Sequence, residues 1–334
     1  MSNSSNVKSF NYSYESNNID RVVFQNIDNT VTQINNQVDL DTLDLDEIDN
    51  SDNLNVSKDD WIFGDEAKST GQFGGSQGRL SANFDKIYSD DPTIKEIVNK
   101  YYPDASKEDL ELLFDKMEDT GCGYIAAVNT LFSNYSIKSP EEFYQHFGFY
   151  PTTERFNKKL NKEVTFYNYD YMFLDFFLYH AKEKGYSNIE EVYGNIDEIV
   201  DLKEQNKEIT IEETGMDGTY EIEAAKLFVG YLKERGIELE VTTNDQPLDY
   251  NTINKILNNG DQIVIGGESF DLYYPNDVDN NKVLDDVSEG NVEPHTMYLV
   301  GTTNDPSKVV VSSWGQEFIM NIDDITDYVI YSYD

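Results

Sequence analysis

Apolar residues recur at helical spacing from residue 106 onward. Residues 106–119 place Leu110, Leu113, Phe114 and Met117 on one side, after a capping pair formed by Ser106 and Asp109. Similar patterns predict further helices over 122–135, 139–148, 168–185 and 220–236. The last two end in basic residues followed by glycine, which is typical of a helix C-terminus.

The pattern changes near residue 237. Short β-branched or aromatic segments bounded by turn residues predict strands over 237–244, 261–267, 296–303, 308–314 and 327–333. One more helix, over 249–260, separates the first two strands. Helices followed by strands indicate an α+β fold, with a helical half over about 91–236 and an antiparallel β half over 237–334.

Residues 1 to about 90 carry few apolar clusters. The stretch 39–55 is acidic and low in complexity, and "STGQFGGSQGRLS" (69–81) is typical of a flexible linker. We therefore predict a disordered acidic segment over 1–90, which can be removed without loss of the fold. Within it, residues 71–78 are the expected site of easiest cleavage, and one globular domain covers 91–334.

Composition excludes several classes of partner. The formal net charge of −39 argues against binding to nucleic-acid phosphates or to an anionic membrane surface. No apolar run approaches the ~18 residues that span a bilayer, and no signal peptide is evident, so we expect no membrane insertion. Localisation stays open between the cytoplasm and export by a non-classical route. We expect a monomer.

The chain has a single cysteine, Cys122, which lies between Gly121 and Gly123 at the start of a predicted helix. One cysteine excludes an intramolecular disulfide and a cysteine-based structural zinc site. A helix N-terminus lowers the pKa of a thiol and offers backbone N–H groups to an oxyanion, while the two glycines leave room for a substrate chain. The local sequence leaves two alternatives open, a catalytic nucleophile and a small buried core residue.

Three histidines are candidates for a base. His146 and His180 lie toward the ends of predicted helices, where a structural role explains them. His295 instead follows Pro294 and opens a predicted strand after a long polar loop. From that position an imidazole can face a helix N-terminus across a cleft.

The segment "GCGYIAAVNTLF", followed far downstream by "PHTMYLVG" and "VVVSSWGQEF", resembles the papain-like cysteine peptidase clan. The resemblance covers roughly residues 106–320. It implies that Cys122 is the nucleophile and His295 the base, with Trp314 and Gly315 matching the Trp-Gly that follows the residue orienting the base. The order of residues 249–267, a helix and then a strand, is similar to the bacterial double-glycine (bacteriocin-processing) branch.

The chain departs from the family pattern at two positions. Ser312 stands where the family has the asparagine that orients the histidine, and Asp305, in the turn over 302–308 that precedes Ser312, is the alternative. Lys116 stands where the family has its oxyanion glutamine, and it is either an oxyanion donor or a solvated helix residue. Asp119 resembles the aspartate of ovarian-tumour-type deubiquitinases, which share the clan, although a turn or capping role explains it too.

An acidic loop, residues 277–289, matches an EF-hand calcium loop only in part. Lys282 replaces the required glycine and Ser288 the bidentate glutamate. We therefore expect no metal, and the resemblance implies no cofactor.

The resemblance thus implies a cysteine peptidase that hydrolyses a peptide or protein substrate through Cys122 and His295. Two alternatives remain: a thiol acyltransferase or amidase that uses the same pair, and a catalytically degenerate papain-like binding module.

Overall fold

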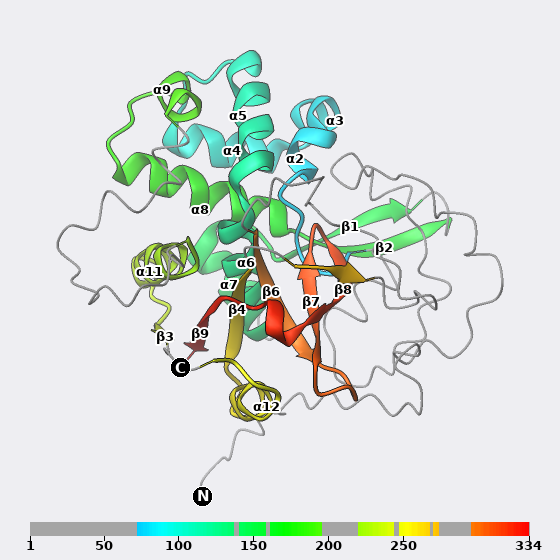
Figure 1. Ribbon diagram of the computed structural model, residues 1–334. Helices are drawn as coiled ribbons and strands as arrows, with labels where there is room; N and C mark the ends of the chain where they lie inside the picture. The colour runs from blue at the N-terminus through cyan, green and yellow to red at the C-terminus, as the bar shows by residue number, and fades with distance from the viewer. Residues whose placement is uncertain are drawn as a thin grey trace, which may run out of the picture.

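The computed structural model describes residues 72–136, 140–157, 161–195, 220–243, 247–267, 270–273 and 295–333. Within these ranges most helices precede an antiparallel sheet along the chain, and the architecture is α+β, as the sequence predicts (Figure 1). The predictions for residues 1–71 and for the loop 277–289 lie outside the described residues. No helix in the described part is both long and apolar enough to cross a membrane.

The six predicted helices are confirmed to within a few residues. Ser106 starts α5 as expected, because its hydroxyl accepts a hydrogen bond from the Asp109 amide at 3.1 Å. The described helices are α2 (Arg79–Ala82), α3 (Phe84–Asp90), α4 (Pro92–Tyr101), α5 (Lys107–Thr120), α6 (Cys122–Leu131), α7 (Pro140–Phe147), α8 (Tyr169–Glu183), α9 (Ile189–Gly194), α11 (Tyr220–Lys233) and α12 (Tyr250–Asn258). A π-helical turn, η4 (Phe132–Ser136), continues α6, and a 3-10 turn, η6 (Ile322–Asp324), follows the strand β8.

The strands form two sheets in which every described pairing is antiparallel. Seven strands make the main sheet in the order β3-β9-β4-β6-β7-β8-β5, and β1 and β2 form a separate hairpin that the sequence analysis did not predict. Their bounds are β1 (Thr152–Asn157), β2 (Lys162–Tyr167), β3 (Leu239–Thr243), β4 (Gln262–Gly267), β5 (Leu272–Tyr273), β6 (His295–Thr302), β7 (Lys308–Ser313), β8 (Gln316–Asn321) and β9 (Asp327–Tyr333).

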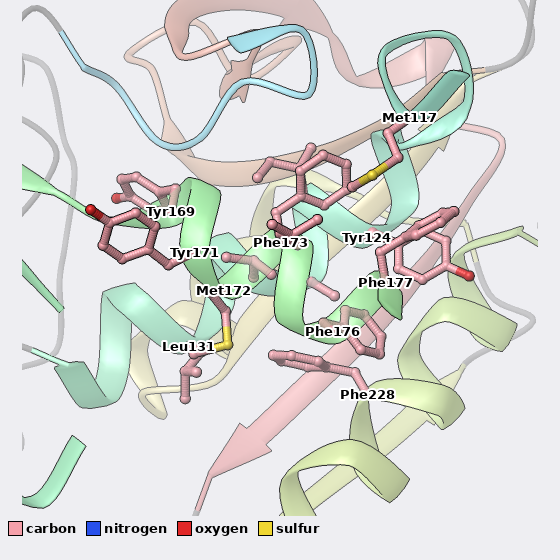
Figure 2. Packing of buried hydrophobic residues seen from close by; sticks show 14 of the residues in the cluster. Met117, Tyr124, Leu131, Tyr169, Tyr171, Met172, Phe173, Phe176, Phe177 and Phe228 are labelled. Atoms are coloured by element: carbon pink, nitrogen blue, oxygen red, sulfur yellow. The ribbon is translucent and has the colours of Figure 1, made fainter. Parts of the chain in front are cut away.

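Two central helices, α6 and α8, are buried almost all round. Every residue of α6 from Gly123 to Leu131 is buried, and α8 is buried from Tyr169 to Leu178. A helix that is apolar on all sides belongs inside a protein. Figure 2 shows Phe173, Phe176 and Phe177 of α8 packed among side chains of α5, α6 and α11.

The two faces of the main sheet belong to different apolar clusters. Along β6, Tyr298 joins the large cluster that contains α6 and α8, whereas Met297 and Leu299 join a smaller cluster with α12. This follows from the alternation of side chains along a strand. His295 has the same parity as Met297, so its side chain belongs to the α12 face.

A buried carboxylate ties three helices together. Asp175 of α8 accepts hydrogen bonds from Tyr101 at 2.9 Å and Tyr231 at 2.6 Å, and it pairs with Arg235 at 3.0 Å and Lys100 at 2.9 Å. These partners come from α4 and from the end of α11. The charge is thus compensated on several sides, as a buried charge requires.

The predicted domain boundary near residue 90 is wrong. Residues 72–80 are buried, and α2 and α3 belong to the folded domain, since Leu80 and Phe84 join the large apolar cluster. A buried ion pair of 3.2 Å joins Arg79 to Asp170 of α8. The glycine- and serine-rich composition predicts a linker, but the segment is fixed by contacts with residues far along the chain.

Candidate active site

Cys122 occupies the first position of α6, directly after Gly121, which precedes the first helical turn. Its side chain is partly exposed, while the rest of the helix is buried. The helix packs against β6, the strand that His295 opens (Figure 1). Cys122 and His295 therefore belong to two elements in contact, although the His295 side chain lies on the sheet face turned to α12.

His295 is buried and held from two sides. Its Nε2 lies 2.7 Å from the Ser313 hydroxyl, and its ring stacks on Trp314 with centroids 4.4 Å apart and planes at 8°. The ring of Phe270 also stacks on the imidazole, with ring centroids 6.2 Å apart. Burial lowers the pKa of the imidazole to about 4, so the ring is neutral at neutral pH.

A tight turn puts Trp314 against the imidazole. Trp314 and Gly315 link β7 to β8 and both have positive φ, 48° and 74°, as in the two-residue turns that join antiparallel strands. A tryptophan rarely adopts this conformation, which suits glycine or asparagine. Trp314 therefore reaches the imidazole of His295 through an unfavourable backbone conformation.

Ser312 does not orient His295, contrary to the sequence prediction. Ser312 pairs with Tyr298 across β6 and β7, which turns its side chain to the α6 face of the sheet. There its hydroxyl donates to the carbonyl of Phe73 at 2.5 Å. Ser313, one residue later, faces the other way and bonds to the imidazole. The alternative, Asp305, accepts from the Ser307 amide within its own turn.

Lys116 and the two glycines also differ from their predicted roles. Lys116 is exposed, because position 116 lies off the apolar stripe that α5 turns to the core, so nothing supports an oxyanion role. Gly121 provides no open space, since an added Cβ would lie 2.4 Å from Phe173 and 2.5 Å from the Met117 carbonyl. Gly123 is buried within α6. Asp119 lies in the last turn of α5.

The other two histidines have the structural roles that the sequence suggests. His180 is buried and its Nδ1 hydrogen-bonds to the Tyr124 hydroxyl. Burial, with a smaller contribution from Lys184, lowers the pKa of His180 to about 3. His146 bonds through Nδ1 to the carbonyl of Arg235.

Residues 72–77, which we call the strap, run between α6 and the main sheet. The Phe73 amide donates to the Gly315 carbonyl at 2.7 Å, and the Gly75 amide donates to Oδ1 of Asn129 at 2.9 Å. At its start, the side-chain amide of Gln72 exchanges two hydrogen bonds with the backbone of Tyr167. The sequence alone does not predict that the strap, Asn129 and Ser313 belong to the candidate site. The adjacent glycines of the strap are the only local signal, and they also fit a linker.

The described residues contain no group of three potential metal-ligating side chains. No family model, no curated protein and no solved structure matches the chain.

Proposed function

We propose that this protein is a cysteine peptidase in which Cys122 is the nucleophile and His295 the general base. The observation that carries the proposal is the hydrogen bond between His295 Nε2 and Ser313. With Nε2 engaged, Nδ1 is the nitrogen available to take a proton. A base oriented through one nitrogen and free to act through the other is the arrangement that thiol activation needs.

The reaction follows from these roles. The thiol proton of Cys122 passes to Nδ1 of His295, and the sulfur bonds to the carbonyl carbon of the substrate. The oxyanion forms near the first N–H groups of α6, where the helix dipole also favours negative charge. As the carbon–nitrogen bond breaks, His295 returns the proton to the leaving amine. Water then hydrolyses the thioester with His295 again as base.

The surroundings of the imidazole suit a base. Its pKa, lowered to about 4 by burial, keeps it neutral and able to accept a proton from weakly acidic to alkaline pH. When it becomes charged, the face of Trp314 at 4.4 Å stabilises the cation. The acceptor of the acyl group is not determined by these residues, so acyl transfer or amide hydrolysis on the same pair stays an alternative.

A second candidate is a binding module without catalysis. It is favoured by one observation: the parity of β6 assigns His295 to the α12 face of the sheet, whereas α6 packs on the other face. In this alternative His295 is a core residue, satisfied by Ser313 and stacked on Trp314.

Alkylation of Cys122 separates the two candidates. Because Cys122 is the sole cysteine, iodoacetamide labelling followed by intact-mass measurement reports on it directly. A peptidase thiol should react at pH 6 at least about tenfold faster in the parent than in His295→Ala, since an ordinary thiol of pKa 8.5 is almost fully protonated there. His146→Ala should match the parent, because His146 bonds to a distant carbonyl.

The same proteins should be incubated with a mixed peptide substrate and analysed by mass spectrometry. Cleavage by the parent, absent in Cys122→Ala, is the expected result. Identical pH profiles for the parent and His295→Ala, without cleavage, would leave the binding module as the function.

A further inference from the structure

The two halves of the candidate site come from distant parts of the chain, and the strap bonds to both of them. We infer that the strap is a positioning element that fixes α6, and with it Cys122, against the strands that hold His295. The reactivity of Cys122 then depends on residues 72–77, about fifty positions upstream. This inference rests on the proposed function and adds a requirement to it.

On the strand side, Phe73 is bonded through both of its backbone polar groups. Its amide donates to the Gly315 carbonyl at 2.7 Å, and its carbonyl accepts from the Ser312 hydroxyl at 2.5 Å. Gly315 directly follows Trp314, and Ser312 directly precedes Ser313. The strap is thus attached on either side of the two residues that hold the imidazole.

On the helix side, the strap follows the stripe of α6 that begins with Cys122. Positions 122, 125 and 129 share one side of a helix, since they are three and four residues apart. Asn129 accepts the Gly75 amide at 2.9 Å, and Ile125 packs against Gly75. The Gln77 side chain then donates to the Glu118 carbonyl, in the last turn of α5, four residues before Cys122.

The strap packs so closely against α6 and β7 that neither Gly74 nor Gly75 has space for a side chain. A Cβ on Gly75 would lie 2.5 Å from Cδ1 of Ile125 and 2.9 Å from Cβ of Tyr169. A Cβ on Gly74 would lie 2.3 Å from the Ser312 hydroxyl, and this glycine has φ of +85°. A larger residue must push the strap away from α6 or from β7. Misplacement of a catalytic group by about 1 Å costs on the order of 10²-fold in rate, so a small shift is enough to affect Cys122.

The test is Gly75→Ala in the full chain, with Gly230→Ala as the matched control. Gly230 lies in α11 with nothing within 4 Å of an added Cβ, so the same substitution there disturbs nothing. The readout is the alkylation rate of Cys122 at pH 6 and at pH 8. We expect the alkylation rate of Cys122 at pH 6 to be at least about tenfold lower in Gly75→Ala than in the parent. The rate in Gly230→Ala should equal that of the parent. If the strap has only a structural role, Gly75→Ala should loosen it and expose the thiol of Cys122. The alkylation rate would then rise at pH 8 and would not fall selectively at pH 6.

A milder pair of variants tests the inference even where Gly75→Ala fails to fold. Asn129→Ala removes the acceptor of the Gly75 amide, and Asn129→Asp keeps an oxygen in its place. We expect Asn129→Ala to lose reactivity at pH 6 and Asn129→Asp to recover most of it.

Two outcomes overturn the inference, and they are distinguishable. If Gly75→Ala or Asn129→Ala keeps the parent profile while His295→Ala is slower, the pair exists and the strap does not position it. If the parent and His295→Ala have the same pH profile of Cys122 alkylation, the proposed function fails, and with it the inference.

Discussion

His295 and Ser313 are joined across two neighbouring strands by a hydrogen bond of 2.7 Å, while Ser312 turns its hydroxyl to the opposite face. Two adjacent serines thus serve different parts of the site. A serine hydroxyl both donates and accepts, so it orients the ring without fixing its tautomer as a carboxylate does. In the proposed catalytic pair, Ser313 therefore holds the imidazole of His295 in place but polarises it less than a carboxylate would.

Ser313→Ala should slow the alkylation of Cys122 at pH 6 by about 2- to 10-fold. A neutral hydrogen bond contributes roughly 0.5–1.5 kcal/mol, which sets this range. Ser313→Thr retains the hydroxyl and should restore most of the rate. Ser307→Ala, which removes a hydroxyl at the tip of the same hairpin, is the control. Equal rates for Ser313→Ala and the control would exclude an orienting role.

A chain that begins at residue 72 should be much more stable than one that begins at residue 91. The longer chain keeps the strap, the Arg79–Asp170 ion pair and the buried side chains of Leu80 and Phe84. Full burial of one such apolar side chain contributes roughly 1.5–3 kcal/mol. Thermal unfolding followed by near-ultraviolet circular dichroism should show a Tm for the 91–334 chain at least about 10 °C lower, or no transition. Equal Tm values would restore the boundary near residue 90.

Asp175→Ala should cost about 3–5 kcal/mol in the free energy of unfolding. It leaves the buried Arg235 guanidinium and the Tyr231 hydroxyl without their acceptor. Lys100→Ala removes a partner whose side chain is 46% exposed, so it should cost less than about 1 kcal/mol. Urea unfolding at pH 7.5 gives both values. Similar losses for the two variants would show that the carboxylate is not the centre of the network.

Stability should fall as the pH drops below about 6.5. The folded-state pKa of His180, lowered to about 3 by burial, lies below the ordinary value of 6.5, so the unfolded chain takes up a proton that the folded chain refuses. Stability from this group is complete above pH 6.5 and is lost as the pH falls toward 3. At pH 5 the loss is about 2 kcal/mol. His295, with its pKa lowered to about 4, adds a similar loss.

Urea midpoints at pH 7.5 and pH 5 measure this loss. His180→Phe replaces the imidazole with a ring that does not titrate, and it should reduce the difference between the two midpoints. An unchanged difference would mean that other groups cause the acid sensitivity.

The sequence predicts the main helices and most strands well, because their apolar periodicity is local. It also predicts that Cys122 and His295 each lie at the start of an element, which the bounds of α6 and β6 confirm. The serine that bonds to His295 could not be predicted, because the pairing of Tyr298 with Ser312 decides which serine faces the imidazole. That register depends on two strands together and is visible in neither alone.

The ordered structure of the strap could not be predicted from the sequence for a different reason. Its composition is that of a linker, and no apolar period marks it as part of the core. Its order comes from partners such as Ser312, which lies 239 residues further along the chain than Phe73. Local sequence carries no record of a contact at that separation.

That separation also has a consequence for the time at which the site is completed. Phe73 is synthesised 239 residues before its partner Ser312 on β7. At roughly 5–20 residues per second, the strap waits tens of seconds for the strands on which it docks. Contacts of such long range also form late in folding, because the loop must close first. Until β7 has been made, a growing chain therefore carries Cys122 without the strap in place, and the contact between α6 and the main sheet is incomplete.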